Sequence, residues 1–141
     1  GTQQLYLYKC LRDWVESQAT WNIYSTGNSW ATAGAKGSGT DIAAASDEIG
    51  EGATGWHTFG PTSEMVADVQ GWVDSSATNY GWVIADLIDN GGYVIWRSSE
   101  YAADSSTRPK ITITYTVVSA GATTKDFVIN GNFNISGEFK F

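Results

Sequence analysis

Alternation between apolar and polar positions predicts short β-strands along most of the chain. Residues 5–10 carry large side chains on both faces, which is typical of a strand beside a core. A short strand is expected at 55–59, and a further alternating strand is expected at 111–118. The runs 82–88 and 93–98 flank Asp-Asn-Gly-Gly, and Asn-Gly accepts the positive φ values of a tight turn. These two runs are therefore predicted to form a β-hairpin.

One segment changes to a helical period. Its apolar positions are spaced at i, i+1, i+4, i+7 and i+8 and are Met65, Val66, Val69, Trp72 and Val73. This spacing predicts a short helix over 63–74 with one apolar face. Thr62 or Ser63 can cap its N-terminus, and Glu64 lies in the first turn.

The stretch from Ser25 to Gly55 is rich in Gly, Ala, Ser and Thr and has little hydrophobic pattern. It is predicted to be a long loop, and loops of this length are usually functional or mobile. Calcium is the cofactor candidate here, since it takes six to eight oxygen ligands from carboxylates, carbonyls and water. The carboxylates considered are Asp41, Asp47 and Glu48. A solvated acidic loop is the alternative, because the stretch has no Asp-x-Asp-x-Asp-Gly pattern.

The C-terminal residues 127–141 alternate strictly and repeat a hexad built on Phe, Ile and Gly. Such a repeat occurs in β-solenoids and fibrous stalks, and it is also compatible with one long edge strand or two strands kinked at a glycine. On each interpretation the apolar stripe must be shielded from water by other protein surface, and self-association is one way to shield it. The stripe residues predicted to assemble are Phe127, Ile129, Phe133, Ile135 and Phe139.

Several short strands with one minor helix predict an all-β fold, namely an antiparallel, jelly-roll-like β-sandwich with a C-terminal β extension. We expect one sandwich module over 1–118, a linker over 119–126 and the amphipathic tail over 127–141. The 141 residues suit a single domain.

Composition excludes several classes of protein. The chain has 15 Asp and Glu against 8 Lys and Arg, a formal net charge of -7, which argues against a nucleic-acid footprint. It has no apolar run of about 20 residues, so membrane insertion is not expected. One Cys and one His exclude an internal disulfide and a His-based zinc cluster. The abundance of small polar residues favours an extracellular, cell-surface or virion-surface location.

Three segments together resemble the DNRLRE domain, also called the disaggregatase-related repeat. They are residues 12–16 with 19–22, residues 69–73 with 79–82, and residues 98–100 with 108–110. The resemblance spans Leu5 to Tyr115 and implies a β-sandwich of secreted, cell-surface or phage proteins. Some members of that family are similar to carbohydrate-binding modules and accompany polysaccharide-degrading enzymes.

The chain departs from that family pattern at both ends. Several N-terminal strands of the family are lacking, and the tail from Lys125 onward has no counterpart in it. One hypothesis joins the two departures: a tail strand, from this chain or from a neighbour, completes the sheet.

No constellation of residues favours catalysis. His57 lies between Trp56 and Thr58 without a plausible Ser or Cys partner, so a structural role is expected. A glycosidase needs two carboxylates at a fixed separation. Nothing in the sequence fixes the separation of the carboxylates that flank the predicted hairpin and the loop after it, namely Asp86, Asp89, Glu100 and Asp104. The chain is therefore predicted not to be an enzyme.

The aromatic residues divide into two predicted groups. The tryptophans of the family-like motifs are expected in the core: Trp14, Trp21, Trp72 and Trp82. A second group is expected to stack on sugar faces: Trp30, Trp56, Tyr93, Trp96 and the adjoining Arg97. For Trp96 an inward, core-filling orientation stays equally open. Glu100 is expected to pair with an arginine such as Arg108 and to pin a loop to the sheet, and Cys10 is expected to be a buried thiol.

These features lead to two hypotheses of function. The first is a non-catalytic adhesion or recognition module whose partner is a polysaccharide or cell-surface glycan. The alternative is a structural subunit of an extracellular filament or viral fibre, assembled by strand exchange through the tail.

Overall fold

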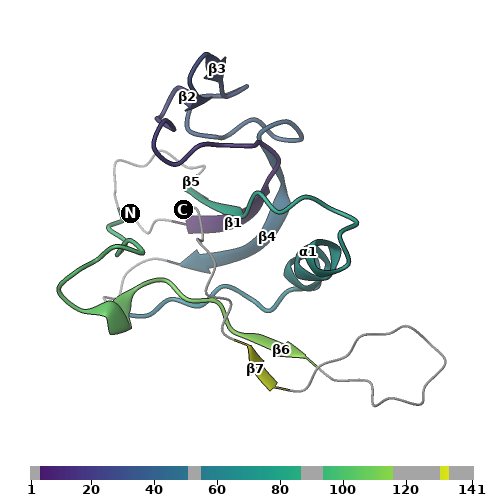
Figure 1. The fold of residues 1–141 in the computed structure, drawn as a ribbon, viewed down its shortest axis with the longest axis vertical. Helices are drawn as coiled ribbons and strands as arrows, with labels where there is room; N and C mark the ends of the chain where they lie inside the picture. The colour runs from purple at the N-terminus through teal and green to yellow at the C-terminus, as the bar shows by residue number, and fades with distance from the viewer. Residues whose placement is uncertain (1–3, 51–54, 87–93, 116–130, 134–141) are drawn as a thin grey trace. The chain divides into compact units, whose positions relative to one another are not determined.

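The computed structural model describes residues 4–50, 55–86, 94–115 and 131–133 (Figure 1). The described residues are mostly strand and irregular chain with one short α-helix. In chain order the elements are β1 (Gln4–Cys10), β2 (Ile23–Ser25), β3 (Asn28–Ser29), β4 (Ile42–Gly50), α1 (Ser63–Val73), β5 (Trp82–Asp86), the 3-10 helix η1 (Ser105–Thr107), β6 (Ile113–Tyr115) and β7 (Gly131–Phe133).

The chain divides into two compact units between Ile95 and Trp96. We call the described residues up to Ile95 the first unit and those from Trp96 the second unit. This division differs in position from the expected linker at 119–126, which lies outside the described residues.

The first unit is built on a three-stranded antiparallel sheet in the order β4-β1-β5. Central β1 confirms the strand predicted at 5–10. Tyr8 pairs with Ala45 on one side and Val83 on the other. The β1–β4 register shifts between Leu7 and Tyr8, and both of these neighbours are buried. A bulge of this kind breaks the strict in-out alternation of a strand.

The core of this sheet is small. Tyr8, Ile42 and Ala85 form its buried cluster, and Tyr6 and Val83 pack against it. Each of the three strands contributes at least one of these side chains, so the cluster holds the sheet together through burial of apolar surface.

Strand β4 corrects the prediction of a continuous loop over 25–55. It runs for nine residues in the sequence Ile-Ala-Ala-Ala-Ser-Asp-Glu-Ile-Gly. That composition has weak strand propensity, because Ala, Asp, Glu and Gly are depleted in strands. Pairing with β1 along most of its length overrides the local preference.

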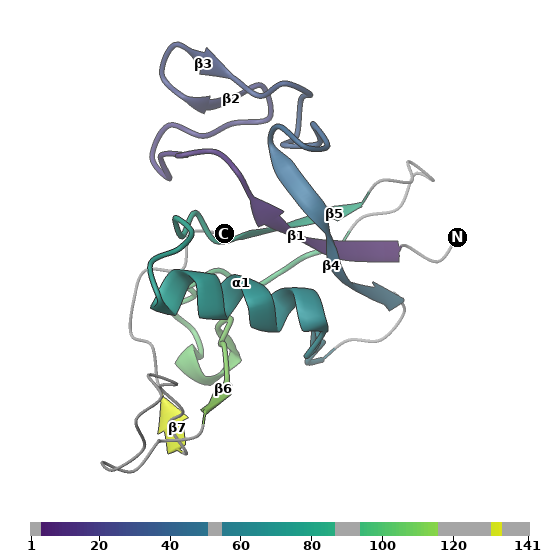
Figure 2. The ribbon, with the colours of Figure 1, turned by 90° about the vertical axis from the view of Figure 1, so that its right-hand side faces the viewer.

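Helix α1 confirms the predicted helix and its cap. Thr62 Oγ1 accepts a hydrogen bond from the backbone N–H of Met65 at 3.2 Å, and Glu64 lies in the first turn. The expected apolar face is only partly covered, because Val66 and Val73 are 59% and 62% exposed. Figure 2 shows α1 alongside the sheet of the first unit.

Two further strand predictions are wrong. Residues 55–59 and 94–98 form no strand, so the predicted hairpin after β5 lacks its second strand, and its turn lies outside the described residues. Within the described residues neither segment belongs to a sheet, and propensity alone does not order a strand.

The second unit contains the predicted strand at 111–118 in part, as β6. It pairs antiparallel with β7 from the tail, in the register Ile113 with Phe133 and Tyr115 with Gly131. The tail therefore supplies a strand, as expected, and its other residues lie outside the described ones. Within the described part of the chain, no helix is both long enough and apolar enough to cross a membrane.

Candidate functional site

The β2–β3 hairpin forms a separate two-stranded sheet at one end of the first unit (Figure 2). Ser25 pairs with Asn28 across a turn made by Thr26 and Gly27. Gly27 has a φ of 80°, a left-handed conformation that favours glycine. Strands of three and two residues are too short to be stable alone, so contacts outside the hairpin must fix it.

Those contacts come from the segment that precedes β2. The backbone N–H of Val15 donates to the carbonyl of Tyr24 at 2.9 Å. The N–H of Thr26 donates to Gln18 Oε1 at 2.8 Å. The hairpin is thereby tied to the chain that leads out of β1.

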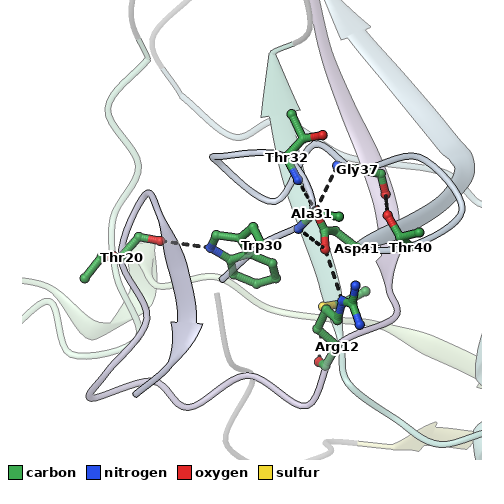
Figure 3. Close-up of polar contacts among 9 residues, drawn as sticks. Arg12, Thr20, Trp30, Ala31, Thr32, Gly37, Thr40 and Asp41 are labelled. Carbon is green, nitrogen blue, oxygen red and sulfur yellow. Dashed lines mark hydrogen bonds and ion pairs between the residues drawn. The ribbon is translucent and has the colours of Figure 1, made fainter. Parts of the chain in front are cut away.

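Trp30, a predicted ligand residue, follows β3 and is half-buried. Its indole Nε1 donates to the carbonyl of Thr20 at 2.9 Å (Figure 3). Its ring centroid lies 5.4 Å from that of Tyr24, with the planes tilted by 54°. Because the indole N–H is hydrogen-bonded and the ring packs on Tyr24, the orientation of the Trp30 ring is set before any ligand binds.

Trp21 corrects the prediction that it fills the core, because it is 63% exposed. Its carbonyl accepts from the N–H of Gly34 at 2.6 Å. A Cβ at Gly34 would lie 2.6 Å from two atoms of the Trp21 ring, so the backbone at this position packs directly on the indole. Lys36 Nζ lies 5.4 Å from the ring centroid, within cation–π range.

We call the side chains of Trp21, Tyr24 and Trp30 the aromatic surface. Thr20 and Asn22, the two neighbours of Trp21, both accept hydrogen bonds from Trp30 through their carbonyls. The three rings therefore belong to one local structure. Aromatic faces of this kind can pack against the C–H groups of a ligand, because their negative quadrupole attracts positive edges.

Asp41 lies at the base of the same region and is fully buried. Figure 3 shows four donors around its carboxylate. Oδ1 accepts from Arg12 Nε at 3.1 Å and from the N–H of Ala31 at 3.0 Å. Oδ2 accepts from the N–H groups of Thr32 and Gly37, each at 3.0 Å. One carboxylate thus closes the loop from Ala31 to Gly37 and joins it to Arg12.

The surroundings of Asp41 stabilise its charged form. Burial alone would raise the pKa of this carboxyl. The hydrogen bonds from Ala31, Thr32, Arg12 and Gly37 outweigh burial and hold the pKa below its ordinary value.

At Asp41 each carboxylate oxygen already accepts hydrogen bonds from two N–H donors, one of them the Arg12 cation, so the structure lends no support to the calcium prediction there, which stays a prediction. Asp47 and Glu48 lie in β4, where their backbones pair with Leu7 and Tyr6, and their side chains are outside the described part. Residues 4–50, 55–86, 94–115 and 131–133 contain no group of three or more His, Cys, Asp or Glu that could hold a metal.

The other predicted ligand residues belong to other segments of the chain. Trp56 is 54% exposed and lies in the segment between β4 and α1. Trp96 is 41% exposed and lies in the second unit, where Arg97 stacks 3.9 Å from the ring centroid of Tyr101. Tyr93 lies outside the described residues.

The predicted structural tryptophans have mixed outcomes. Trp14 is confirmed as buried, and its Nε1 donates to the carbonyl of Tyr80 at 3.0 Å. Trp72 and Trp82 are partly buried and pack on each other with centroids 4.5 Å apart. Cys10 is confirmed as a buried thiol, and burial raises its pKa.

The expected pairing of Glu100 with Arg108 is absent from the described residues. Arg108 Nε donates instead to the carbonyl of Tyr101 at 3.0 Å, and Glu100 is exposed. A backbone acceptor close in sequence satisfies the guanidinium without the cost of ordering a second long side chain. His57 is half-buried in the irregular segment before α1.

The comparisons with family models, curated proteins and solved structures found no match to this chain. The resemblance to the DNRLRE domain therefore stays a prediction. The assembly residues of the tail lie outside the described side chains, and Phe133 is placed only by its backbone pairing in β7.

Sequence reasoning missed Arg12, Tyr24 and Lys36 in this region and assigned Trp21 to the core. The available signal was the Thr26-Gly27 turn with aromatic residues on both sides, at 21, 24 and 30. That signal indicates a hairpin, but it leaves open which rings face solvent.

Proposed function

We propose that this chain is a non-catalytic recognition module that binds polysaccharide through the aromatic surface. The observation that carries the proposal is Trp21, a large apolar ring that is 63% exposed although its position is held by Gly34. Exposing such a ring is unfavourable in water, and exposed aromatic groups in fixed positions are typical of binding sites.

Rigidity supports the proposal further. The Trp30 indole is bonded to Thr20, and the Tyr24 carbonyl is bonded to Val15. A ligand that docks on rings already in place loses less conformational entropy than one that must order a loop. Polar atoms at the rim of the hairpin, such as the exposed Asn28, can reach sugar hydroxyls.

We also propose that the module works outside the cell, on a secreted, cell-surface or virion assembly, and that its sheets belong to a jelly-roll-like β-sandwich. The abundance of small polar residues supports the extracellular location, and the DNRLRE-like segments support both the location and the sandwich fold. The antiparallel β4-β1-β5 sheet is compatible with one layer of such a fold.

The test is binding of the purified chain to a panel of polysaccharides by affinity electrophoresis, with titration calorimetry for any polymer that retards it. Trp21→Ala is expected to weaken binding by about tenfold to thirtyfold, which corresponds to about 1.4–2 kcal/mol. This is the scale expected for losing a partly buried aromatic contact.

Trp56→Ala is the matched control, since Trp56 is similarly exposed in the same unit but belongs to the segment between β4 and α1 and not to the aromatic surface. It is expected to bind as the unmodified chain does. Loss of binding in Trp56→Ala but not in Trp21→Ala would place the site elsewhere, and no binding to any polymer would refute the function.

A second candidate function is a structural subunit assembled by strand exchange. It is favoured by β7, a strand from the tail that pairs antiparallel with β6. The same pairing supplied by the tail of a neighbouring copy would link subunits. Light scattering across a dilution series tests it, because exchange predicts species larger than a monomer at high concentration.

A further inference from the structure

Asp41 is connected to the aromatic surface along two routes. One route is through the loop: Trp30 directly precedes Ala31 and Thr32, whose N–H groups donate to the two carboxylate oxygens. The other route is through Arg12, whose Nε donates to Oδ1. The Arg12 guanidinium also lies 5.4 Å from the ring centroid of Tyr24.

The packing around Asp41 leaves little room for the loop to adopt another arrangement. A Cβ at Gly37 would lie 2.5 Å from Asp41 Oδ2 and 2.6 Å from Thr40 Oγ1, so the loop backbone is packed directly on the carboxylate. The side chain of Asp41 has no exposed surface, whereas that of Arg12 is 33% exposed. Asp41 therefore cannot touch a ligand itself, and any effect it has on binding must pass through the groups it holds.

We propose that Asp41 is a positioning residue for the aromatic surface, fixing Trp30 through the loop at 31–37 and Tyr24 through Arg12. The inference rests on the proposed function of that surface. It assigns a binding role to a residue that is not in contact with solvent, and it predicts that Trp30 and Tyr24 lose their fixed positions when the carboxylate is replaced.

The test is Asp41→Asn in the full chain. The amide keeps one acceptor oxygen but turns a donor toward N–H groups that previously had an acceptor. The affinity for a polysaccharide bound by the unmodified chain is expected to fall at least tenfold. The indole N–H resonance of Trp30 in a ¹H–¹⁵N spectrum is expected to shift or broaden, because its bond to Thr20 depends on the anchored loop.

Ile42→Val is the control for a purely structural effect. Ile42 is 2% exposed and adjacent in sequence, and the change removes one methyl group from the core without altering the carboxylate contacts. This variant is expected to keep the affinity within twofold and to leave the Trp30 resonance in place. Should Asp41→Asn not fold, Arg12→Met removes both the bond to Oδ1 and the contact with Tyr24 but keeps the three backbone N–H donors of Asp41, and it is expected to weaken binding several-fold.

The outcomes distinguish the positioning role of Asp41 from the polysaccharide-binding function. Unchanged affinity and an unmoved Trp30 resonance in Asp41→Asn would overturn the positioning role while leaving the binding function intact. If the unmodified chain binds no polysaccharide, the proposed function fails. The Trp30 spectrum of the variant then still decides whether Asp41 orients the rings.

Discussion

The buried carboxylate of Asp41 is tolerated because its hydrogen-bond donors are backbone N–H groups and the cationic side chain of Arg12. Moving an ionised Asp out of water is costly. Three N–H groups and Arg12 Nε offset that cost with hydrogen bonds to a charged acceptor, which are stronger than neutral ones. The same bonds explain why the pKa of Asp41 lies below its ordinary value of 3.8.

This pKa shift predicts a pH-dependent stability. The folded state holds Asp41 ionised at lower pH than the unfolded chain does, so its stabilisation is present above the unfolded pKa and is lost as pH falls through the folded pKa. At pH 7, Asp41→Asn is expected to lower the free energy of unfolding by about 2–4 kcal/mol. Urea unfolding at pH 7 and at several values below pH 3.8 should show this difference shrinking toward acid.

Asp13→Asn is the control, because Asp13 is exposed beside the same segment. A surface change of this kind is expected to shift the free energy of unfolding by less than about 0.5 kcal/mol. A difference between Asp41→Asn and the unmodified chain that stays constant from pH 7 into acid would contradict the assigned ionisation.

Among the elements, α1 is attached to the sheet by the Trp72–Trp82 packing and by the acidic side chain of Asp68. Asp68 Oδ2 accepts from the indole Nε1 of Trp82 at 2.9 Å, and Oδ1 lies 3.1 Å from Lys9 Nζ. Trp82 belongs to β5 and Lys9 to β1, so a single helical residue contacts two strands. The Asp68 side chain is 13% exposed, which limits screening of the ion pair by solvent.

Replacing Asp68 should therefore loosen the helix. Asp68→Ala is expected to lower the free energy of unfolding by about 1.5–3 kcal/mol, since it leaves the Trp82 N–H and the Lys9 ammonium without this acceptor. Asp68→Asn keeps an acceptor for Trp82 and loses only the charge, so about half that loss is expected. Chemical denaturation followed by tryptophan fluorescence measures both, and equal losses in the two variants would assign the effect to the ion pair alone.

At the scale of the whole molecule, the tail contributes to the second unit through β7, which pairs with β6. Deleting residues 125–141 is expected to speed amide exchange in β6 and to lower the melting temperature or abolish self-association. The amides of β1 should stay protected, because its partners β4 and β5 lie in the first unit.

Hydrogen exchange and light scattering on the truncated and full-length chains provide the measurements. A truncated chain that keeps its melting temperature, its oligomeric state and the protection of β6 would show that the tail has neither role.

Elements with strong local signals were predictable from the sequence alone. The run of large side chains at β1 and the 3.6-residue period of α1, with Thr62 as one of its two candidate caps, needed no tertiary information. The buried positions of Trp14 and Cys10 were also expected, Trp14 from its place in the family-like motifs and Cys10 from its place on a strand.

The tertiary structure decided the rest, because the responsible contacts join residues distant in sequence. β4 becomes a strand through pairing with β1 about 40 residues away, against its own weak propensity. Asp41 becomes a buried anchor because Arg12, 29 positions earlier, meets it. Trp21 faces solvent because Gly34 holds it at the surface, and nothing in its local sequence distinguishes it from the buried Trp14. Local periodicity reports which residues share a face, whereas exposure and charge pairing depend on which distant segments fold against that face.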